Sequence, residues 1–233
     1  IYVDADATGA HDGSSWPDAF LDLQPALDAT VSGDQIWVAE GTYKPTYEFT
    51  PGNPRSVSFQ MKNGVEIYGG FAGTETNLTD RDWVTNPTIL SCDLTGDDGA
   101  DFTNTAENCY HVFYHPVGTN LNSSAILNGF TIRGGHADGL FPHDGGGGMH
   151  NYTSSPTVVN CTFTNNQAHL GGGIFNREAA SPVISNCTFM DNWADYGGGI
   201  FNRDSSFPNL SDCIIIGNYA ESAGGGMHND NCS

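Results

Sequence analysis

The side chains that could carry out acid–base chemistry gather around one loop in the second half of the chain. They are an arginine followed by two histidines and an aspartate: Arg133, His136, Asp138 and His143, with Asp144 next to the last of them. A strong base or an imidazole close to carboxylates is the combination that general acid–base catalysis requires. The surroundings of Arg133 are therefore the candidate catalytic cleft, although an ordinary polar loop would explain the same residues.

A second group of residues has the composition of a metal site. Four aspartates fall within nine residues and are accompanied by Gly96 and Gly99: Asp93, Asp97, Asp98 and Asp101. Carboxylate oxygens on a glycine-kinked turn suit calcium, although the spacing is not that of an EF-hand loop. The alternative is that aspartate simply populates turns. A weaker cluster of the same kind lies near the start of the chain: Asp4, Asp6 and Asp12. The sequence thus predicts at most a structural calcium ion.

The elements that would position these residues follow from an internal repeat. Glycine triplets begin at Gly146, Gly171, Gly197 and Gly224, at steps of 25, 26 and 27 residues. Between the triplets, four further columns keep a step of 26 residues: Pro156, Pro182 and Pro208; Cys161, Cys187 and Cys213; Asn166, Asn192 and Asn218; Ala168, Ala194 and Ala220. Several positions sharing one period indicate a solenoid.

The residues inside one period indicate which solenoid this is. Residues 182–189 are rich in β-branched and aromatic side chains, and a glycine run precedes a second short apolar stretch, with no helical segment between them. We therefore predict an all-β chain that forms one parallel β-helix with coils of about 26 residues, stacked about 4.8 Å apart. Four asparagines should form a ladder at one turn: Asn151, Asn176, Asn202 and Asn229. Cys161, Cys187 and Cys213 should form a second column of buried, unpaired thiols.

The chain divides into three regions. Residues 1–34 should form an N-terminal cap, a strand plus a short amphipathic helix with Asp22 as N-cap and Gly33 near its end. The apolar stripe of that helix consists of Leu23, Ala26, Leu27, Thr30 and Val31. Residues 35–124 should form irregular coils, with strands at 35–39, 56–61, 65–68, 88–91 and 110–115. Residues 125–233 should form regular coils that are open at the C-terminal end, where we expect the fold to continue or to dock.

Aligning the first regular coil with the next one fixes its register. Ala137 then matches Ala168, which places Phe130 over Cys161 and Ile132 over Phe163. The extra residues of this coil fall in the loop 137–144. His150 and His228 share one repeat position but lie three coils apart, so they are too distant to share a metal, and we expect them to be turn residues.

Charge excludes several classes of partner. The chain has 27 acidic and 7 basic residues, which gives 7 − 27 = −20. Such a surface lacks the cations needed to follow phosphates, which argues against nucleic acid, and anionic lipid headgroups would repel it. No apolar run approaches the roughly 18 residues of a membrane span, so we expect no direct membrane insertion. Arg177 and Arg203, one coil apart beside Glu178 and Asp204, favour a solvated charge ladder over a catalytic site.

The repeats and the first 43 residues of the sequence resemble those of known protein families. The pairs 163–166 with 171–174, and 189–192 with 197–200, resemble the FxxN and GG(A/G)I repeats of polymorphic outer membrane proteins. The segments 2–6, 12–16 and 36–43 resemble the start of secreted bacterial right-handed β-helix repeat proteins. The resemblance implies that the β-helix is a right-handed, pectate-lyase-like parallel β-helix, that it is exported, and that it is part of a longer surface protein, as is usual in this family. In such a protein, Cys92 and Cys109 could form a disulfide across the aspartate-rich loop, whereas Cys232 has no evident partner.

Three functions compete on these grounds. The first is a non-catalytic structural or adhesive protein of the bacterial cell surface, which assembles with itself head to tail into filaments or contacts other surface components. The second is a polysaccharide lyase or glycoside hydrolase; lyases of this fold use calcium near carboxylates and an arginine or lysine as base, and the hydrolases use aspartate pairs. The third is a glycan-binding module without turnover. The sequence favours the first.

Overall fold

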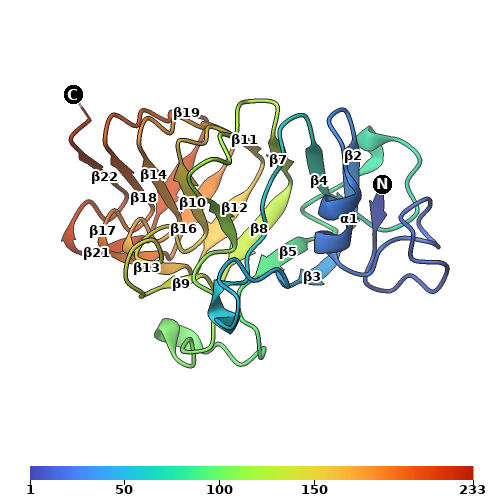
Figure 1. Ribbon diagram of the computed structural model, residues 1–233, viewed down its shortest axis with the longest axis horizontal. Helices are drawn as coiled ribbons and strands as arrows, with labels where there is room; N and C mark the ends of the chain where they lie inside the picture. Colours follow the sequence, from blue (N-terminus) through green and yellow to red (C-terminus); the bar gives the residue numbers. More distant parts are fainter. Residues whose placement is uncertain (233) are drawn as a thin grey trace.

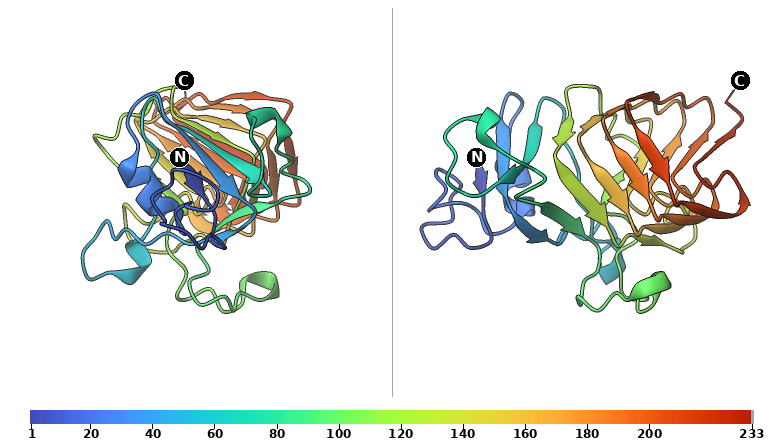
Figure 2. Two further views of the ribbon diagram at one scale, coloured as in Figure 1. Left: turned by 90° about the vertical axis from the view of Figure 1, so that its right-hand side faces the viewer. Right: turned by 180° about the vertical axis from the view of Figure 1, so that it is seen from behind.

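Parallel strands wind through the molecule as successive coils of one solenoid. The computed structural model describes residues 1–232. Every pair of named strands is parallel, and the coils stack along the long axis, with the N-terminus at one end and the C-terminus at the other (Figures 1 and 2). This confirms the predicted all-β, right-handed parallel β-helix with one short helix.

Each regular coil passes through four sheets, one strand in each. The first sheet contains β1 (Tyr2–Val3), β2 (Gln35–Ala39), β4 (Glu66–Phe71), β7 (Ile126–Asn128), β11 (Thr157–Val159), β15 (Val183–Ser185) and β19 (Asn209–Ser211). The second contains β3 (Gly41–Tyr43), β5 (Thr88–Ser91), β8 (Phe130–Arg133), β12 (Thr162–Thr164), β16 (Thr188–Met190) and β20 (Ile214–Ile216). The third contains β9 (His136–Ala137), β13 (Gln167–Leu170), β17 (Trp193–Tyr196) and β21 (Tyr219–Ala223). The fourth contains β6 (Phe113–His115), β10 (Met149–Tyr152), β14 (Ile174–Arg177), β18 (Ile200–Arg203) and β22 (Met227–Asp230).

The first regular coil pairs with the second in the register that the alignment of the repeats predicted. Ala168 pairs with Ala137, and Phe163 pairs with Ile132. Upstream, one expected strand is absent: residues 56–61 begin in the 3₁₀ turn η1 (Pro54–Ser56) and make only isolated bridges at Val57 and Phe59. Two further 3₁₀ turns, η2 (Leu78–Asp80) and η3 (Ala100–Phe102), lie in the long loops.

The N-terminal end is covered by the helix α1 (Leu23–Ala29), which buries Leu23, Ala26 and Leu27. Two details differ from expectation. Asp22 occupies the N-cap position but makes no side-chain cap bond, and the helix ends before Thr30, so that Val31 is 68% exposed. Lys62 caps this end of the helix, because its ammonium group donates to backbone carbonyls of the last turn, where a positive charge is favourable. Within residues 1–232, no helix is long and apolar enough to cross a membrane.

Buried asparagines connect the coils to one another. Asn151 donates to Asn176 at 2.9 Å, Asn176 to Asn202 at 2.9 Å, and Asn202 to Asn229 at 2.8 Å. This ladder runs through the strands of the fourth sheet, not through a turn as expected, and Asn151, Asn176 and Asn202 are buried. A second ladder occupies the bend between the second and third sheets: Asn166, Asn192 and Asn218, with Nδ2–Oδ1 distances of 3.0 and 2.8 Å.

The glycine triplets mark places where adjacent coils come too close for a side chain. The first glycine of the second triplet, Gly171, has φ +65°, which disfavours other residues. The third, Gly173, lies so close to the next coil that a Cβ atom would sit 2.5 Å from the carbonyl oxygen of Gly199. The triplet therefore combines a left-handed turn with close backbone stacking.

The cysteine column faces the core. Cys161 and Cys187 are buried, Cys213 is half-buried, and all three are free thiols. Each lies at the bend just before a strand of the second sheet and not inside a strand. Cys232 is also free and its Sγ contacts the carbonyl oxygen of Ser206 at 3.3 Å.

Candidate functional site beneath the disulfide-closed loop

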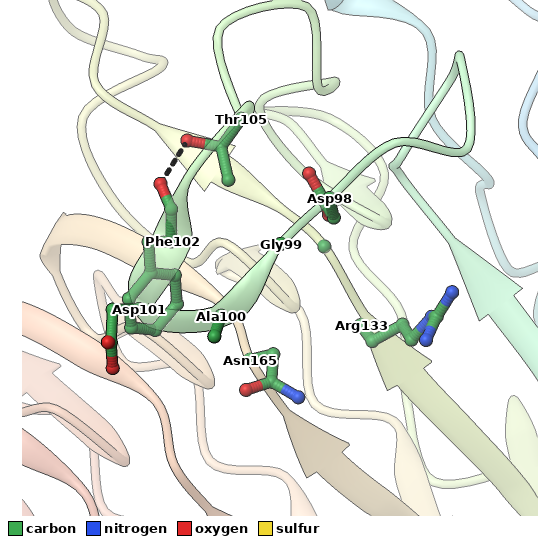
Figure 3. A pocket seen from close by; sticks show the side chains of 9 residues that line it. Asp98, Gly99, Ala100, Asp101, Phe102, Thr105, Arg133 and Asn165 are labelled. Atoms are coloured by element: carbon green, nitrogen blue, oxygen red, sulfur yellow. Dashed lines mark hydrogen bonds between the residues drawn. The ribbon is translucent and has the colours of Figure 1, made fainter.

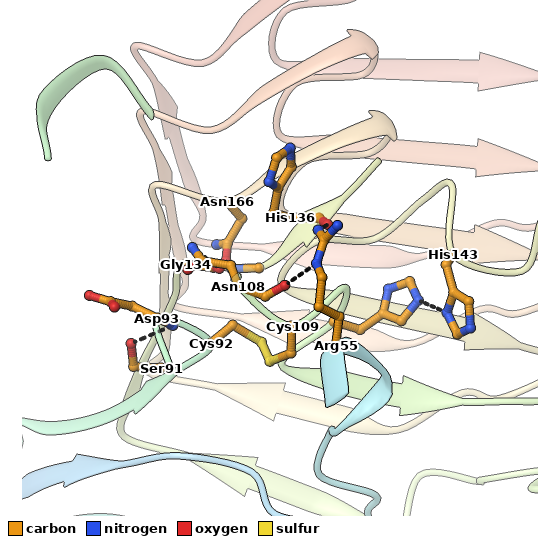
Figure 4. The surroundings of a disulfide bond; sticks show 12 residues. Arg55, Ser91, Cys92, Asp93, Asn108, Cys109, Gly134, His136, His143 and Asn166 are labelled. Atoms are coloured by element: carbon orange, nitrogen blue, oxygen red, sulfur yellow. Dashed lines mark hydrogen bonds between the residues drawn. A yellow bond between two sulfur atoms is a disulfide. The ribbon is translucent and has the colours of Figure 1, made fainter. Parts of the chain in front are cut away.

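A disulfide closes the aspartate-rich loop at its base. Cys92 and Cys109 are bonded, are fully buried and have Cα atoms 5.0 Å apart (Figure 4). Cys92 directly follows β5, and the backbone N–H of Cys109 donates to the carbonyl of Cys92 at 3.1 Å. The loop between them projects from the body of the solenoid (Figure 1). The disulfide thus fixes both ends of the loop at the second sheet, while its middle extends outward.

Asp93 organises the start of this loop. Its carboxylate accepts backbone hydrogen bonds from Gly96 at 2.5 Å, Asp97 at 3.1 Å and Asp98 at 3.4 Å, and the residue is 4% exposed. A side-chain oxygen that accepts several nearby N–H groups fixes a turn. Asp93 therefore has a local structural role, whatever else it binds.

The four aspartates of the predicted metal site do not lie together in the structure. Asp93 and Asp97 lie together with Glu107, and one ligand atom from each falls within 4.8 Å of the others, the one such group in the described part of the chain. The Thr95 hydroxyl contacts both Asp97 and Glu107. Asp98 and Asp101 are not members of this group. Sequence spacing missed Glu107 because only the closed loop brings it back beside Asp93.

Asp98 turns toward the body of the solenoid. The amide of Asn108 donates to both of its carboxylate oxygens, at 3.1 and 3.0 Å, and to the carbonyl of Gly134 at 2.8 Å. Burial raises the pKa of Asp98, and the carboxylates of Asp93 and Glu107 add to this shift, whereas the hydrogen bonds from Asn108 and the charge of Arg133 oppose it. Asp98 therefore links the loop to the coil through a buried amide.

Arg133 lines a small polar cavity under the loop. The cavity has a volume of about 180 Å³ (Figure 3), and its lining comes from the loop and from the ends of β8 and β12: Asp98, Gly99, Ala100, Asp101, Phe102, Thr105, Arg133, Gly134 and Asn165. The Nε atom of Arg133 is buried without a hydrogen-bond partner among residues 1–232. Of the predicted catalytic residues, Arg133 is the one that lines this cavity.

His136 and Asp138 are engaged by Arg55, which the sequence did not single out. Arg55 donates to Asp138 at 2.7 Å, to the carbonyl of His136 at 2.8 Å and to that of Asn108 at 2.7 Å. Nδ1 of His136 lies 2.8 Å from the carbonyl oxygen of Thr105. Burial raises the pKa of Asp138, but the hydrogen bond from Arg55 and the nearby positive charges outweigh it and the pKa is lowered. These two residues secure the loop 137–144 to its neighbours.

His143 belongs to a third environment, a cluster of aromatic rings. Its ring stacks on Tyr110 at 4.4 Å, and its Nδ1 lies 3.2 Å from Nε2 of His111. Because Nδ1 of His111 is 3.0 Å from the carbonyl of Gly146 and must donate to it, His143 is the donor to His111. Burial lowers the pKa of both histidines. The predicted catalytic residues therefore have three different sets of partners. Two of these sets adjoin, because Arg55 stacks over Tyr110 at 4.4 Å.

We expected His150 to lie in a turn, and this expectation is wrong. His150 lies within β10 and is fully buried, without a hydrogen-bond partner for either ring nitrogen among the described residues. Burial lowers its pKa to about 3. His228 lies within β22. The period located this position correctly, but it did not distinguish a strand from a turn.

Comparison with known proteins bears on the fold. The family described as right handed beta helix region matches residues 58–233. Searches of the curated proteins and of the solved structures found no match. The matched residues include the predicted catalytic residues, the disulfide and every regular coil. The chain belongs to the right-handed beta helix family.

Proposed function

We propose that this chain is a non-catalytic scaffold of an extracellular surface, with a structural or adhesive role. The observation that carries the proposal is that buried asparagine side chains form hydrogen bonds from coil to coil. Asn176 and Asn192, each in the middle of a ladder, use their amides to connect three successive coils. Such ladders make a stiff rod, because shifting one coil breaks bonds to both neighbours.

The surroundings of the predicted catalytic residues support the same proposal. General acid–base catalysis needs a base and an acid within reach of one substrate atom. Asp138 is paired with Arg55, and His143 donates to His111. A purified chain should therefore release neither unsaturated products nor new reducing ends from acidic or neutral polysaccharides, with calcium or with a chelator. Turnover by the intact chain would overturn the scaffold role.

One observation favours the alternative of a polysaccharide lyase. Nε of Arg133 has no hydrogen-bond partner among residues 1–232, and Arg133 lines a cavity beside Asp98. An arginine base close to carboxylates is what such a lyase uses. Arg133→Ala separates the two functions. If the intact chain forms unsaturated products and the variant does not, the lyase function is supported; if neither chain forms them, the scaffold proposal stands.

The proposed location is the outside of a bacterial cell. The Cys92–Cys109 disulfide supports this location, because such bonds persist in oxidising compartments. The chain with its natural flanking sequence, expressed in a bacterium, should be accessible to an added protease on intact cells. Protection until the cells are lysed would contradict the proposed location.

Calcium is the proposed structural cofactor. Asp97 and Glu107 would hold it together with Asp93, because hard oxygen ligands of this kind suit calcium. Its effect would be to neutralise adjacent carboxylates in the projecting loop. This part of the proposal is independent of the scaffold role.

Head-to-tail contact between copies is the proposed mode of assembly. Within residues 1–232, the strands of the last coil have a neighbour on one side only, and Ile214 and Ile216 of β20 are 58% and 60% exposed. In such a contact β1 of a second copy would lie against this coil. Light scattering across a concentration series should reveal growing assemblies that Ile214→Lys suppresses. A monomer at all concentrations would contradict the assembly.

A further inference from the structure

A continuous row of aromatic rings runs along the outer side of the fourth sheet. Tyr114, His150, Phe175, Phe201 and His228 pair in register from β6 to β22. Consecutive ring centroids are 5.4, 4.9, 5.5 and 5.2 Å apart. Side chains alternate across a strand, and the neighbours Met149, Ile174 and Ile200 belong to the central core. The row therefore points away from that core.

Other segments cover most of this outer aromatic row. His150, Phe175 and Phe201 are 0%, 1% and 3% exposed. The backbone of the loop before β10 passes directly over Phe175, since a Cβ atom on Gly145 would lie 2.5 Å from its ring. A cavity of about 310 Å³ lies beside the row at Phe201 and His228, and its lining consists of Leu170, Tyr196, Phe201, Arg203, His228 and Asp230.

Rings form the floor and one wall of this cavity. Phe201 and His228 stack at an angle of 7° between their planes. Tyr196, from β17, stands edge-on to both, with centroids 6.5 Å from Phe201 and 5.7 Å from His228, and it is 40% exposed. The cavity thus offers a ligand one accessible ring on a rigid strand, next to an aromatic floor formed by the buried Phe201 and the half-buried His228.

The polar part of the cavity is an ion pair. Nε of Arg203 lies 3.5 Å from Oδ2 of Asp230, and their side chains are both 39% exposed. The pair supplies donors and acceptors. Nε of Arg203 also lies 3.8 Å from Oδ2 of Asp204, and these carboxylates and the formal charge of −20 repel anions. Arg203 also disfavours a cationic ligand, although aromatic rings alone would attract one. The cavity therefore suits a neutral ligand with an apolar face and several hydroxyl groups.

We propose that the cavity between Tyr196 and the Arg203–Asp230 pair binds a sugar ring of a neutral saccharide. The C–H face of the ring packs against Tyr196, and its hydroxyls bond to the guanidinium and the carboxylate. Ligand sites of about 300–1,000 Å³ combine apolar walls with a few polar groups in this way, and this cavity lies at the small end of that range. The inference goes beyond the scaffold role and does not depend on it.

The test measures binding to the intact chain by calorimetry and by saturation-transfer NMR. The neutral probes are the tetrasaccharides of cellulose, laminarin, mannan and chitin; tetragalacturonate and N-acetyltryptophanamide are the charged and aromatic comparisons. At least one neutral probe should bind, with saturation transferred to its ring C–H protons. Tyr196→Ala should weaken binding at least about tenfold, and Asp230→Asn should weaken it severalfold.

Tyr219→Ala is the matched control, because Tyr219 is an exposed tyrosine of the next coil in the same sheet and lies outside the cavity lining. Its effect should be less than about twofold. Absence of binding by every neutral tetrasaccharide, equal losses in the two tyrosine variants, or tighter binding of either comparison probe would overturn the inference. If Tyr196→Ala fails to fold, the binding measured for Asp230→Asn tests the proposed site instead. Turnover of a bound saccharide would contradict the scaffold role but leave this site standing.

Discussion

Asn176 donates a hydrogen bond of 2.9 Å from its side-chain amide to Oδ1 of Asn202, one coil further along the solenoid. Its own Oδ1 accepts from Asn151 at the same distance. A carboxamide can donate and accept through two different atoms, so each asparagine serves both neighbours. His115 extends this ladder into an irregular coil, since its Nδ1 lies 2.8 Å from Oδ1 of Asn151.

Replacing an asparagine in the middle of this ladder should destabilise the fold strongly. Asn176→Leu leaves an amide of Asn151 and an oxygen of Asn202 buried without partners, at about 1–3 kcal/mol for each group. Urea unfolding should show the loss as a lower midpoint. Asn209→Leu, at an exposed position in β19, should change the midpoint little. Equal midpoints for the two variants would mean that the ladder adds no stability.

The third glycine of a triplet should tolerate no side chain where another coil follows. In Gly173→Ala, the new methyl group would lie 2.5 Å from the carbonyl oxygen of Gly199, so the backbones must separate at a cost of about 1–3 kcal/mol. Gly226→Ala is the matched control, because its nearest contact is a side-chain methyl of Ile215 at 3.1 Å. Thermal unfolding should rank the first variant well below the second. Similar melting temperatures would contradict close stacking as the reason for the triplet.

Stability should fall as the pH falls from about 6.5 toward 4. Burial lowers the pKa of His115 to about 4 and that of His150 to about 3. Between these values and the unfolded pKa of about 6.5, the unfolded chain binds protons that the folded chain does not, so acid favours unfolding. Each such histidine contributes up to about 1.4 kcal/mol per pH unit.

His150→Phe tests this pH dependence. Phenylalanine already occupies the same position in the next two coils, at Phe175 and Phe201. The variant should fold, and a plot of its unfolding free energy against pH should be shallower than that of the original chain below pH 6. Identical slopes would show that His150 does not contribute to the acid sensitivity.

Calcium should stabilise the projecting loop if Asp93, Asp97 and Glu107 hold it. A free calcium concentration of one hundred times Kd would add about 2.7 kcal/mol to the free energy of unfolding. Thermal unfolding with calcium and with a chelator should therefore differ, and Glu107→Gln should remove the difference. Asp101→Asn should preserve it, because Asp101 lies outside the group of three. An unchanged melting temperature in calcium would contradict the proposed cofactor.

Much of the fold could be predicted from the sequence, because residues at equivalent positions of each repeat meet the same packing requirements. A step of 26 residues placed Ala168 beside Ala194 and Phe163 beside Phe189, and the structure pairs them in that register. The irregular coils were harder to predict, because the segment 56–61 has a strand-like composition but makes only isolated bridges, at Val57 and Phe59. Glu107 and Arg55 could not be assigned at all, since their partners lie across a disulfide loop or far away along the chain.

The sequence by itself determined the solenoid, its period and the residues that stack from coil to coil. Periodicity suffices there, because equivalent residues of a parallel β-helix become neighbours whatever the loops do. Only the tertiary structure decided which polar groups meet between columns. In the folded chain Asp138 pairs with Arg55, Glu107 lies beside Asp93, and a cavity lies between Tyr196 and Asp230. These contacts depend on loop paths and on the angles between sheets, and no repeat in the sequence encodes either.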